Sequence, residues 1–187
     1  MNAEPEDPVS TEITEEFRAA LGRDLVEAAY LTGDFVLSSG QRSSYYLDKY
    51  LFETQPSILR RLARLMGAHV PQGTDRLAGP ELGAVALAAV ASMETDLPFV
   101  IVRKEPKGYG TAKHLEGTLS PGERVLVVED VITSGGEAIR AAQRLTEVGA
   151  HVIGILGVVD REQGGPERIA EAGFVFTALY TRTQLGV

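Results

Sequence analysis

Residues 125–139 read VLVVEDVITSGGEAI, and this stretch decides which fold the chain adopts. It opens with residues 125–128, an apolar and mostly β-branched run that is typical of a strand buried on both faces of a parallel sheet. Two carboxylates follow, Glu129 and Asp130, and a Thr-Ser-Gly-Gly segment then leads into a helix-like pattern. The order of strand, loop and helix predicts an α/β fold.

The loop in this stretch has the chemistry of a phosphate site. Gly135 and Gly136 let backbone N–H groups approach a ligand closely, and the hydroxyls of Thr133 and Ser134 add donors. The N-terminus of the following helix carries partial positive charge. The two acids ahead of the loop can accept hydrogen bonds from sugar hydroxyls or lie near a metal. A phosphorylated sugar would therefore suit both the acid pair and the phosphate loop. Taken singly, each piece is more often a structural turn.

The assembled string resembles the phosphoribosyl-diphosphate binding signature of the type I phosphoribosyltransferases. It is neither a Walker A loop, because Gly-Lys-Ser/Thr is missing, nor a Gly-x-Gly-x-x-Gly dinucleotide fingerprint. The resemblance implies an α/β fold with a mostly parallel central sheet, helices on both faces and a small N-terminal hood. It also implies that Glu129 and Asp130 hold the ribose hydroxyls and stabilise positive charge on the ring.

Composition restricts the class of protein. The 187 residues, 44% of them hydrophobic, suggest a single domain with a proper core. A net charge of −8 argues against a general nucleic-acid binder, and no apolar stretch is long enough for a membrane helix. Residues 1–10 are expected to form a flexible tail. Cysteine is absent, which excludes disulfides and thiolate metal sites and fits a cytoplasmic protein.

The rest of the chain alternates between strand and helix patterns. Strands are expected at residues 76–79, 99–102, 151–159 and 174–180, and helices at residues 14–31, 58–70, 83–93 and 138–148. Ligands of such sheets bind beyond the carboxyl ends of the strands. The strand ends near Gly79, Arg103, Glu129 and Asp160 should therefore form one site. The turn at residues 79–83 is either an anion site or a tightly packed turn.

Two further segments are interpreted as parts of this site. The pattern of residues 34–49 predicts a hairpin, although an ordinary surface hairpin explains it equally well. The hairpin is expected to belong to a hood of about residues 11–56, over a core of about residues 57–187. Residues 103–117 read RKEPKGYGTAKHLEG, a basic segment without periodicity. A loop of this length predicts a mobile lid over a polyanion, the alternative being a solvated charged loop. Arg60, Arg61 and Arg64 are expected on a solvated helix face.

Three strings are similar to those of orotate phosphoribosyltransferases. They are the hairpin with its Ser-Gly turn, the lid pattern Arg-Lys-x-x-Lys-x-His-Gly and the string Val-Asp-Arg-x-x-Gly-Gly at residues 159–165. The resemblance implies binding of orotate by Ser39, Gly40, Thr133 and Arg161. It implies binding of phosphoribosyl diphosphate by Arg103, Lys104, Lys107, Tyr109, Glu129, Asp130, Val131, Ile132, Thr133, Ser134, Gly135, Gly136 and Glu137. The catalytic set is Lys107, Arg103, Asp130 and Glu129.

The implied reaction converts orotate and phosphoribosyl diphosphate to orotidine 5′-phosphate and diphosphate in UMP biosynthesis. The resemblance also implies Mg²⁺ held mainly through the substrate, with no dedicated protein ligand, and a homodimer whose lid reaches the partner's site. Tyr109 replaces the lid histidine, and Ser38 and Gly83 stand where some orotate enzymes carry lysine. Lys49 is a candidate replacement for the first of those lysines. The alternatives are transfer to another base, such as a purine, and a ligand-sensing regulator without turnover.

Overall fold

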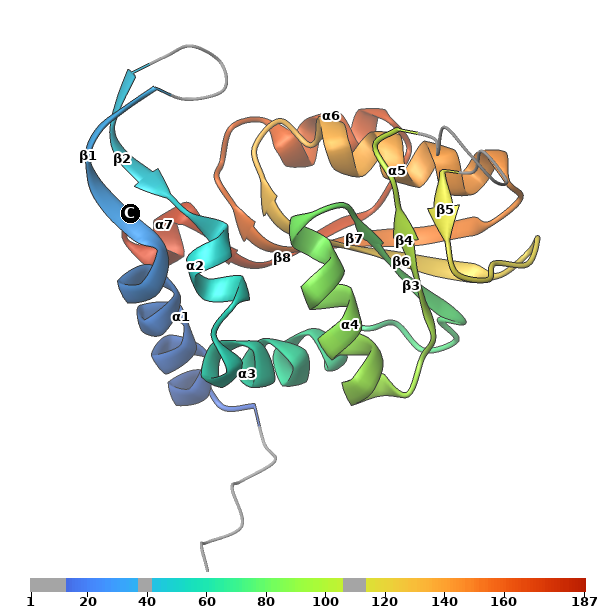
Figure 1. Cartoon of the computed structure of the whole chain (residues 1–187), viewed down its shortest axis with the longest axis horizontal. Coiled ribbons are helices and arrows are strands. Elements are labelled where there is room, and N and C mark those ends of the chain that lie inside the picture. The colour runs from blue at the N-terminus through green and yellow to red at the C-terminus, as the bar shows by residue number, and fades with distance from the viewer. Residues whose placement is uncertain (1–12, 37–41, 106–113) are drawn as a thin grey trace, which may run out of the picture.

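A computed structural model describes residues 13–36, 42–105 and 114–187, and it contains a large sheet and a small one (Figure 1). The large sheet runs in the order β5 (Leu115–Glu116), β4 (Phe99–Val102), β3 (Arg76–Pro80), β6 (Arg124–Ile132), β7 (His151–Asp160) and β8 (Phe176–Thr181). All neighbouring strands are parallel except β4 and β5, which are antiparallel. The predicted, mostly parallel sheet is confirmed.

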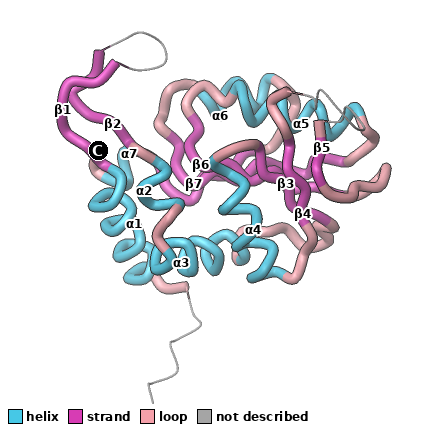
Figure 2. Tube along the Cα trace, in the orientation of Figure 1, coloured by secondary structure: helices cyan, strands magenta, loops and turns pink. Residues whose placement is uncertain are grey.

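Helices cover both faces of this sheet, as Figures 1 and 2 show. One face carries α1 (Glu15–Ala29), α3 (Pro56–Gly67) and α4 (Gly83–Thr95), and the other carries α5 (Gly136–Glu147) and α6 (Gly165–Glu171). The short helices α2 (Lys49–Glu53) and α7 (Arg182–Leu185) follow β2 (Arg42–Leu47) and β8. A chain that alternates strands with helices gives this layered arrangement because each face of the sheet must be buried.

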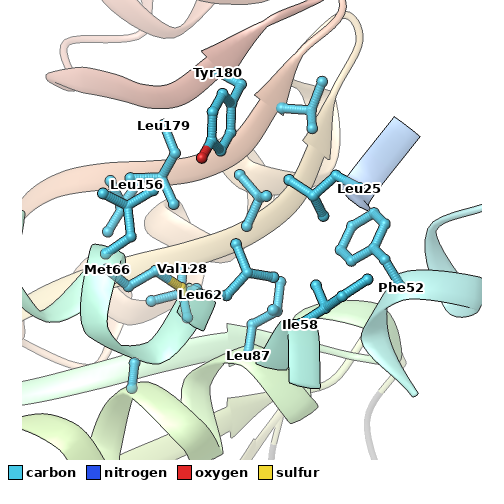
Figure 3. Packing of buried hydrophobic residues seen from close by; sticks show 14 of the residues in the cluster. Leu25, Phe52, Ile58, Leu62, Met66, Leu87, Val128, Leu156, Leu179 and Tyr180 are labelled. Atoms are coloured by element: carbon cyan, nitrogen blue, oxygen red, sulfur yellow. The ribbon is translucent and has the colours of Figure 1, made fainter. Parts of the chain in front are cut away.

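The strand β6 lies between β3 and β7, and its side chains feed two separate hydrophobic clusters. Leu126 and Val128 join the cluster under α1, α3 and α4, which includes Leu62 and Met66 (Figure 3). Val125 and Val127 join the cluster under α5 and α6. Successive side chains of a strand point to opposite faces, so an unbroken apolar run is buried on both sides. Burial of each such side chain contributes about 1.5–3 kcal/mol.

The N-terminal hood consists of α1, α2 and the hairpin of β1 (Tyr30–Val36) and β2 (Arg42–Leu47), which extends beyond the large sheet in Figure 2. Thr14 caps α1 by accepting a hydrogen bond from the backbone N–H of Phe17. The hood is joined to the C-terminal strand because Arg18 donates to the carbonyl of Leu179 at 2.7 Å. The hydroxyl of Tyr180 donates back to the carbonyl of Arg18 at 2.9 Å.

Several expectations about the elements need correction. The strand β6 does not end at residue 128 but continues to Ile132, so Glu129 and Asp130 lie within it. Residues 115–116 of the predicted lid form the edge strand β5. Arg61 and Arg64 do not lie on a free solvated face: the first pairs with Asp24 at 2.5 Å, and the second lies over the ring of Phe17. Each gains an attractive partner on α1 that the helical periodicity alone does not reveal.

The division into tail, hood and core is untested and stays a prediction, and residues 1–10 lie outside the described residues. Across the described parts of the chain, no helix is both long enough and apolar enough to span a membrane.

Candidate active site

A cleft of about 370 Å³ lies beyond the carboxyl ends of β3 and β6, where the sequence places it. It is lined by the acid pair Glu129 and Asp130, the loop at residues 133–136 and the turn at residues 80–83, together with Lys49 and Lys104. Parallel strands end at the same edge of a sheet, which is why loops far apart in sequence meet here. The structure thus brings together most of the predicted set for phosphoribosyl diphosphate.

The loop at residues 133–136 turns directly into α5, so the first amides of the helix face the cleft. Gly135 has a φ of 72° and precedes the helix as its N-cap. A Cβ at this position would lie 2.9 Å from Cγ1 of Ile169, so glycine is required on both conformational and steric grounds. A helix N-terminus with free amides and a glycine approach is suited to a phosphate group.

The acid pair is buried at the wall of the cleft, where Glu129 is 6% and Asp130 2% exposed. Burial raises the pKa of Glu129 to about 8, and the neighbouring charge of Asp130 adds to the shift. Oε2 of Glu129 is buried without a hydrogen-bond partner among the described residues. Asp130 is held by Lys49, whose Nζ donates to Oδ2 at 2.5 Å. The carboxylate of Asp130 at the cleft is therefore paired with a cation from the hood.

Glu53 is a third carboxylate in this cluster and was not predicted as part of the site. It belongs to α2, is 4% exposed, and burial together with the charge of Asp130 raises its pKa to about 8. The sequence gives no signal for it, because Glu53 reads as an ordinary residue of a short helix. Lys49 was expected near the hairpin, and the structure places its ammonium at Asp130, 81 positions away in sequence.

The turn at residues 80–83 is connected to the beginning of the lid segment. The side chain of Glu81 accepts a hydrogen bond from the backbone N–H of Lys104 at 2.7 Å. Arg144 on α5 donates to the carbonyls of Arg103 and Lys104, both at 2.7 Å. Lys104 lines the cleft, whereas the guanidinium of Arg103 lies 3.8 Å from the carboxylates of Glu81 and Glu116. The role predicted for Arg103 at the diphosphate is untested.

A second cavity of about 720 Å³ adjoins the first and is lined by Phe35, Lys49, Asp130, Thr133 and Arg161 among others. Arg161 follows β7, and its Nη2 lies 3.3 Å from the hydroxyl of Tyr45 in the hood. The guanidinium is 5.6 Å from the centroid of the same ring. The hydrogen bond from Arg161 lowers the pKa of the Tyr45 hydroxyl. A cation at the head of a partly aromatic cavity is suited to a flat anionic ring.

The described parts of the chain do not include every predicted site residue. Ser39, Gly40, Lys107 and Tyr109 lie outside them. Val131, Ile132, Ser134, Gly136 and Glu137 all line the first cleft, and their binding of phosphoribosyl diphosphate stays a prediction.

Comparisons with known proteins agree with this geometry. The family model of the phosphoribosyl transferase domain matches residues 52–184, and the chain belongs to this family. Individual relatives within the family indicate one branch of it. An orotate phosphoribosyltransferase of Methanocella arvoryzae is 48% identical over 153 residues, which cover 82% of this chain and 87% of the relative. These matches identify the orotate phosphoribosyltransferases as the branch of the family to which the chain is similar.

Solved structures lead to the same branch. The orotate phosphoribosyltransferase of Mycobacterium tuberculosis in complex with Fe(III) dicitrate has a TM-score of 0.83 and 30% identity, over 91% of this chain and 99% of that one. The structure of the same enzyme in complex with 5-phospho-α-D-ribosyl 1-diphosphate has a TM-score of 0.78 and 29% identity, over 91% and 99% of the two chains. The predicted fold and family are confirmed.

Proposed function

We propose that the protein is an orotate phosphoribosyltransferase, a pentosyltransferase that makes orotidine 5′-phosphate and diphosphate from orotate and phosphoribosyl diphosphate for UMP biosynthesis. One observation carries the proposal: the phosphate cleft and the cavity headed by Arg161 share a wall at Asp130, Thr133 and Ser134. A ribose held at that wall presents its C1 to a base in the second cavity and its 5′-phosphate to the loop.

The roles of the residues follow from the charge that develops during the reaction. The 5′-phosphate is held by amides and hydroxyls at residues 133–136. Asp130 and Glu129 accept hydrogen bonds from the ribose hydroxyls and stabilise positive charge on the ring. Lys104, with Arg103 and Lys107 in the lid, neutralises the negative charge that grows on departing diphosphate. Arg161 orients orotate through its carboxylate, and Ser39 and Gly40 assist.

Mg²⁺ is proposed as the cofactor, held through the substrate. Among the described residues, no group of three or more His, Cys, Asp or Glu is arranged to hold a metal ion. The carboxylates at the cleft are hard oxygen donors that Mg²⁺ accepts, but Lys49 already compensates Asp130. Glu129 and Asp130 are the cleft carboxylates that would lie nearest to an ion carried by the substrate, and such an ion would neutralise diphosphate charge. The protein is also proposed to be cytoplasmic and dimeric, with the lid over the partner's site.

The direct test follows the loss of orotate absorbance with phosphoribosyl diphosphate and Mg²⁺ present, and repeats the assay with purine bases. Among the bases tested, we expect turnover with orotate and none with the purines. Turnover with a purine instead would reassign the base, and binding of phosphoribosyl diphosphate without any turnover would indicate a regulator.

Arg161→Ala tests the base end of the site. We expect the KM for orotate to rise far more than the KM for phosphoribosyl diphosphate, because loss of one partner of a charge pair costs roughly 2–5 kcal/mol. Equal effects on the two KM values would assign Arg161 a structural role only.

A double variant, Glu129→Gln with Asp130→Asn, tests the ribose end. The neutral amides keep the shape of the pair and remove its charge, so we expect a sharp loss of turnover. Unchanged kinetics would remove both acids from the site.

A further inference from the structure

Lys49 reaches the active site from the hood and is in contact with both of its cavities. Its ammonium lies 2.5 Å from Oδ2 of Asp130, and its side chain is 32% exposed. It lines the phosphate cleft and the cavity headed by Arg161. An ammonium has three donors, and one bond to Asp130 leaves two that can bind a ligand in the cleft.

The electrostatics keep this lysine charged. Burial lowers the pKa of Lys49, but the charge and hydrogen bond of Asp130, with the charges of Glu129 and Glu53, outweigh burial and raise it. Burial raises the pKa of Glu53 and that of Glu129 to about 8, so both carry less negative charge at neutral pH than exposed glutamates do. The acids around Lys49 therefore do not cancel its attraction for a dianionic or trianionic ligand in the cleft.

Gly83 makes the position of Lys49 possible. A Cβ on Gly83 would overlap Oδ2 of Asp130 and would lie 2.9 Å from Nζ of Lys49. The ammonium thus occupies the place into which a side chain at position 83 would project. It lies against the turn at residues 80–83, which lines the same cleft as Asp130 and the phosphate loop.

We propose that Lys49 is a further catalytic residue, which binds the diphosphate leaving group while it holds the ribose-binding Asp130. This inference rests on the proposed function and deepens it. As the C1–O1 bond breaks, its electron pair moves to the diphosphate oxygen, and a ring nitrogen of orotate forms the new bond to C1. Lys49 donates a hydrogen bond to the oxygen that gains charge. The proton of the orotate ring nitrogen leaves as the N–C1 bond forms and is taken up by the departing diphosphate, and Lys49 itself transfers no proton. The hood thereby supplies a cation to the core.

The test compares Lys49→Met, Lys49→Arg and a matched control. Arg61→Met is the control because Arg61 is also a partly buried cation paired with an aspartate, but it lies on α3 outside both cavities. Calorimetry measures the binding of inorganic diphosphate with Mg²⁺ and, separately, of ribose 5-phosphate. We expect Lys49→Met to weaken diphosphate binding at least about tenfold and ribose 5-phosphate binding far less, and to lower kcat by roughly 100-fold. Lys49→Arg should recover part of the diphosphate affinity and part of kcat. Arg61→Met should change neither the diphosphate affinity nor kcat.

Other outcomes are equally informative. Unchanged diphosphate affinity in Lys49→Met overturns the proposal, and equal weakening of both ligands reduces Lys49 to a compensating charge for Asp130. If Lys49→Met does not fold, Asp130→Asn is compared with Asp130→Asn/Lys49→Met, in which the pair is neutral; equal diphosphate affinities again overturn the proposal. Weakened diphosphate binding in a protein whose wild type never uses orotate would refute the proposed base and retain the role of Lys49.

Discussion

Tyr45 connects the hood to Arg161 by a single hydroxyl. Its ring stacks on Tyr30 at a centroid distance of 5.5 Å, which fixes the ring, and the hydroxyl lies 3.3 Å from Nη2 of Arg161. Tyr45→Phe keeps the ring and removes the hydroxyl. We expect the KM for orotate to rise roughly fivefold, equivalent to about 1 kcal/mol for one hydrogen bond, with little change for phosphoribosyl diphosphate. Steady-state kinetics with each substrate varied in turn will measure this, and a shift confined to kcat would contradict it.

Glu53 makes stability depend on pH. Its pKa is raised to about 8 in the folded protein, so the folded state keeps a proton that the unfolded state releases at lower pH. The contribution of Glu53 to the free energy of unfolding should therefore be fully present below about pH 4 and should be lost as the pH rises through about 8. Glu53→Gln cannot ionise, so its decline should be shallower, and above pH 8 the variant should be more stable than the wild type.

Urea unfolding at a series of pH values measures this effect. Glu147→Gln, at an exposed position near the end of α5, is the control and should follow the wild-type curve. Parallel curves for Glu53→Gln and the wild type would mean that Glu53 ionises normally in the folded protein.

At the scale of elements, the phosphate loop depends on how closely α6 approaches it. A Cβ on Gly165 would overlap Cγ2 of Ile132 and lie 2.7 Å from the carbonyl oxygen of Thr133. Gly165→Ala must therefore displace the end of β6 or the start of the loop. We expect a loss of about 1–3 kcal/mol in stability and weaker binding of ribose 5-phosphate. Chemical unfolding and calorimetry measure the two effects.

Gly154→Ala on β7 provides the comparison for that variant. It also adds a methyl group to a buried glycine, but the nearest atom, Cδ1 of Leu126, is at an ordinary distance of 3.5 Å. We expect a much smaller change in stability and none in ligand binding. Equal losses in the two variants would mean that the packing of α6 does not determine the loop.

The sequence predicts β3, β4, β6, β7 and β8 because each is an apolar run between turn residues, but it misses the two-residue strand β5. It predicts the end of β6 badly, since Glu129 and Asp130 look like loop residues and the partner of Asp130 lies far away in sequence on α2. The phosphate loop is local, so its pattern is visible in one stretch. Lys49 and Glu53 reach the site from a five-residue helix, and no periodicity can show such a contact. Local chemistry is predictable, and contacts between distant elements are not.

At the scale of the whole molecule, the shared-lid arrangement can be tested by mixing two impaired chains at an orotate concentration well below the KM of Arg161→Ala. Lys107→Ala removes a lid cation, and Arg161→Ala removes the base contact. If the lid covers the partner's site, a heterodimer of these chains has one intact site. Random pairing makes about half of the dimers mixed, so we expect recovery of roughly a quarter of wild-type activity. Assembly without recovery would place each lid over its own subunit.

The bonds between α1 and β8 have a consequence for the order of assembly. The hydrogen bonds of Arg18 with Leu179 and of Tyr180 with Arg18 join residues that are 161 and 162 positions apart. During synthesis, the N-terminal helix leaves the ribosome long before its partner strand exists, and contacts of such long range form slowly. Strands β3, β4, β6 and β7 can pair before β8 exists, whereas the hood, with Tyr45 and Lys49, gains its bonds to β8 only after that strand has been made. A nascent chain therefore gains its phosphate loop before it gains the residues that complete catalysis.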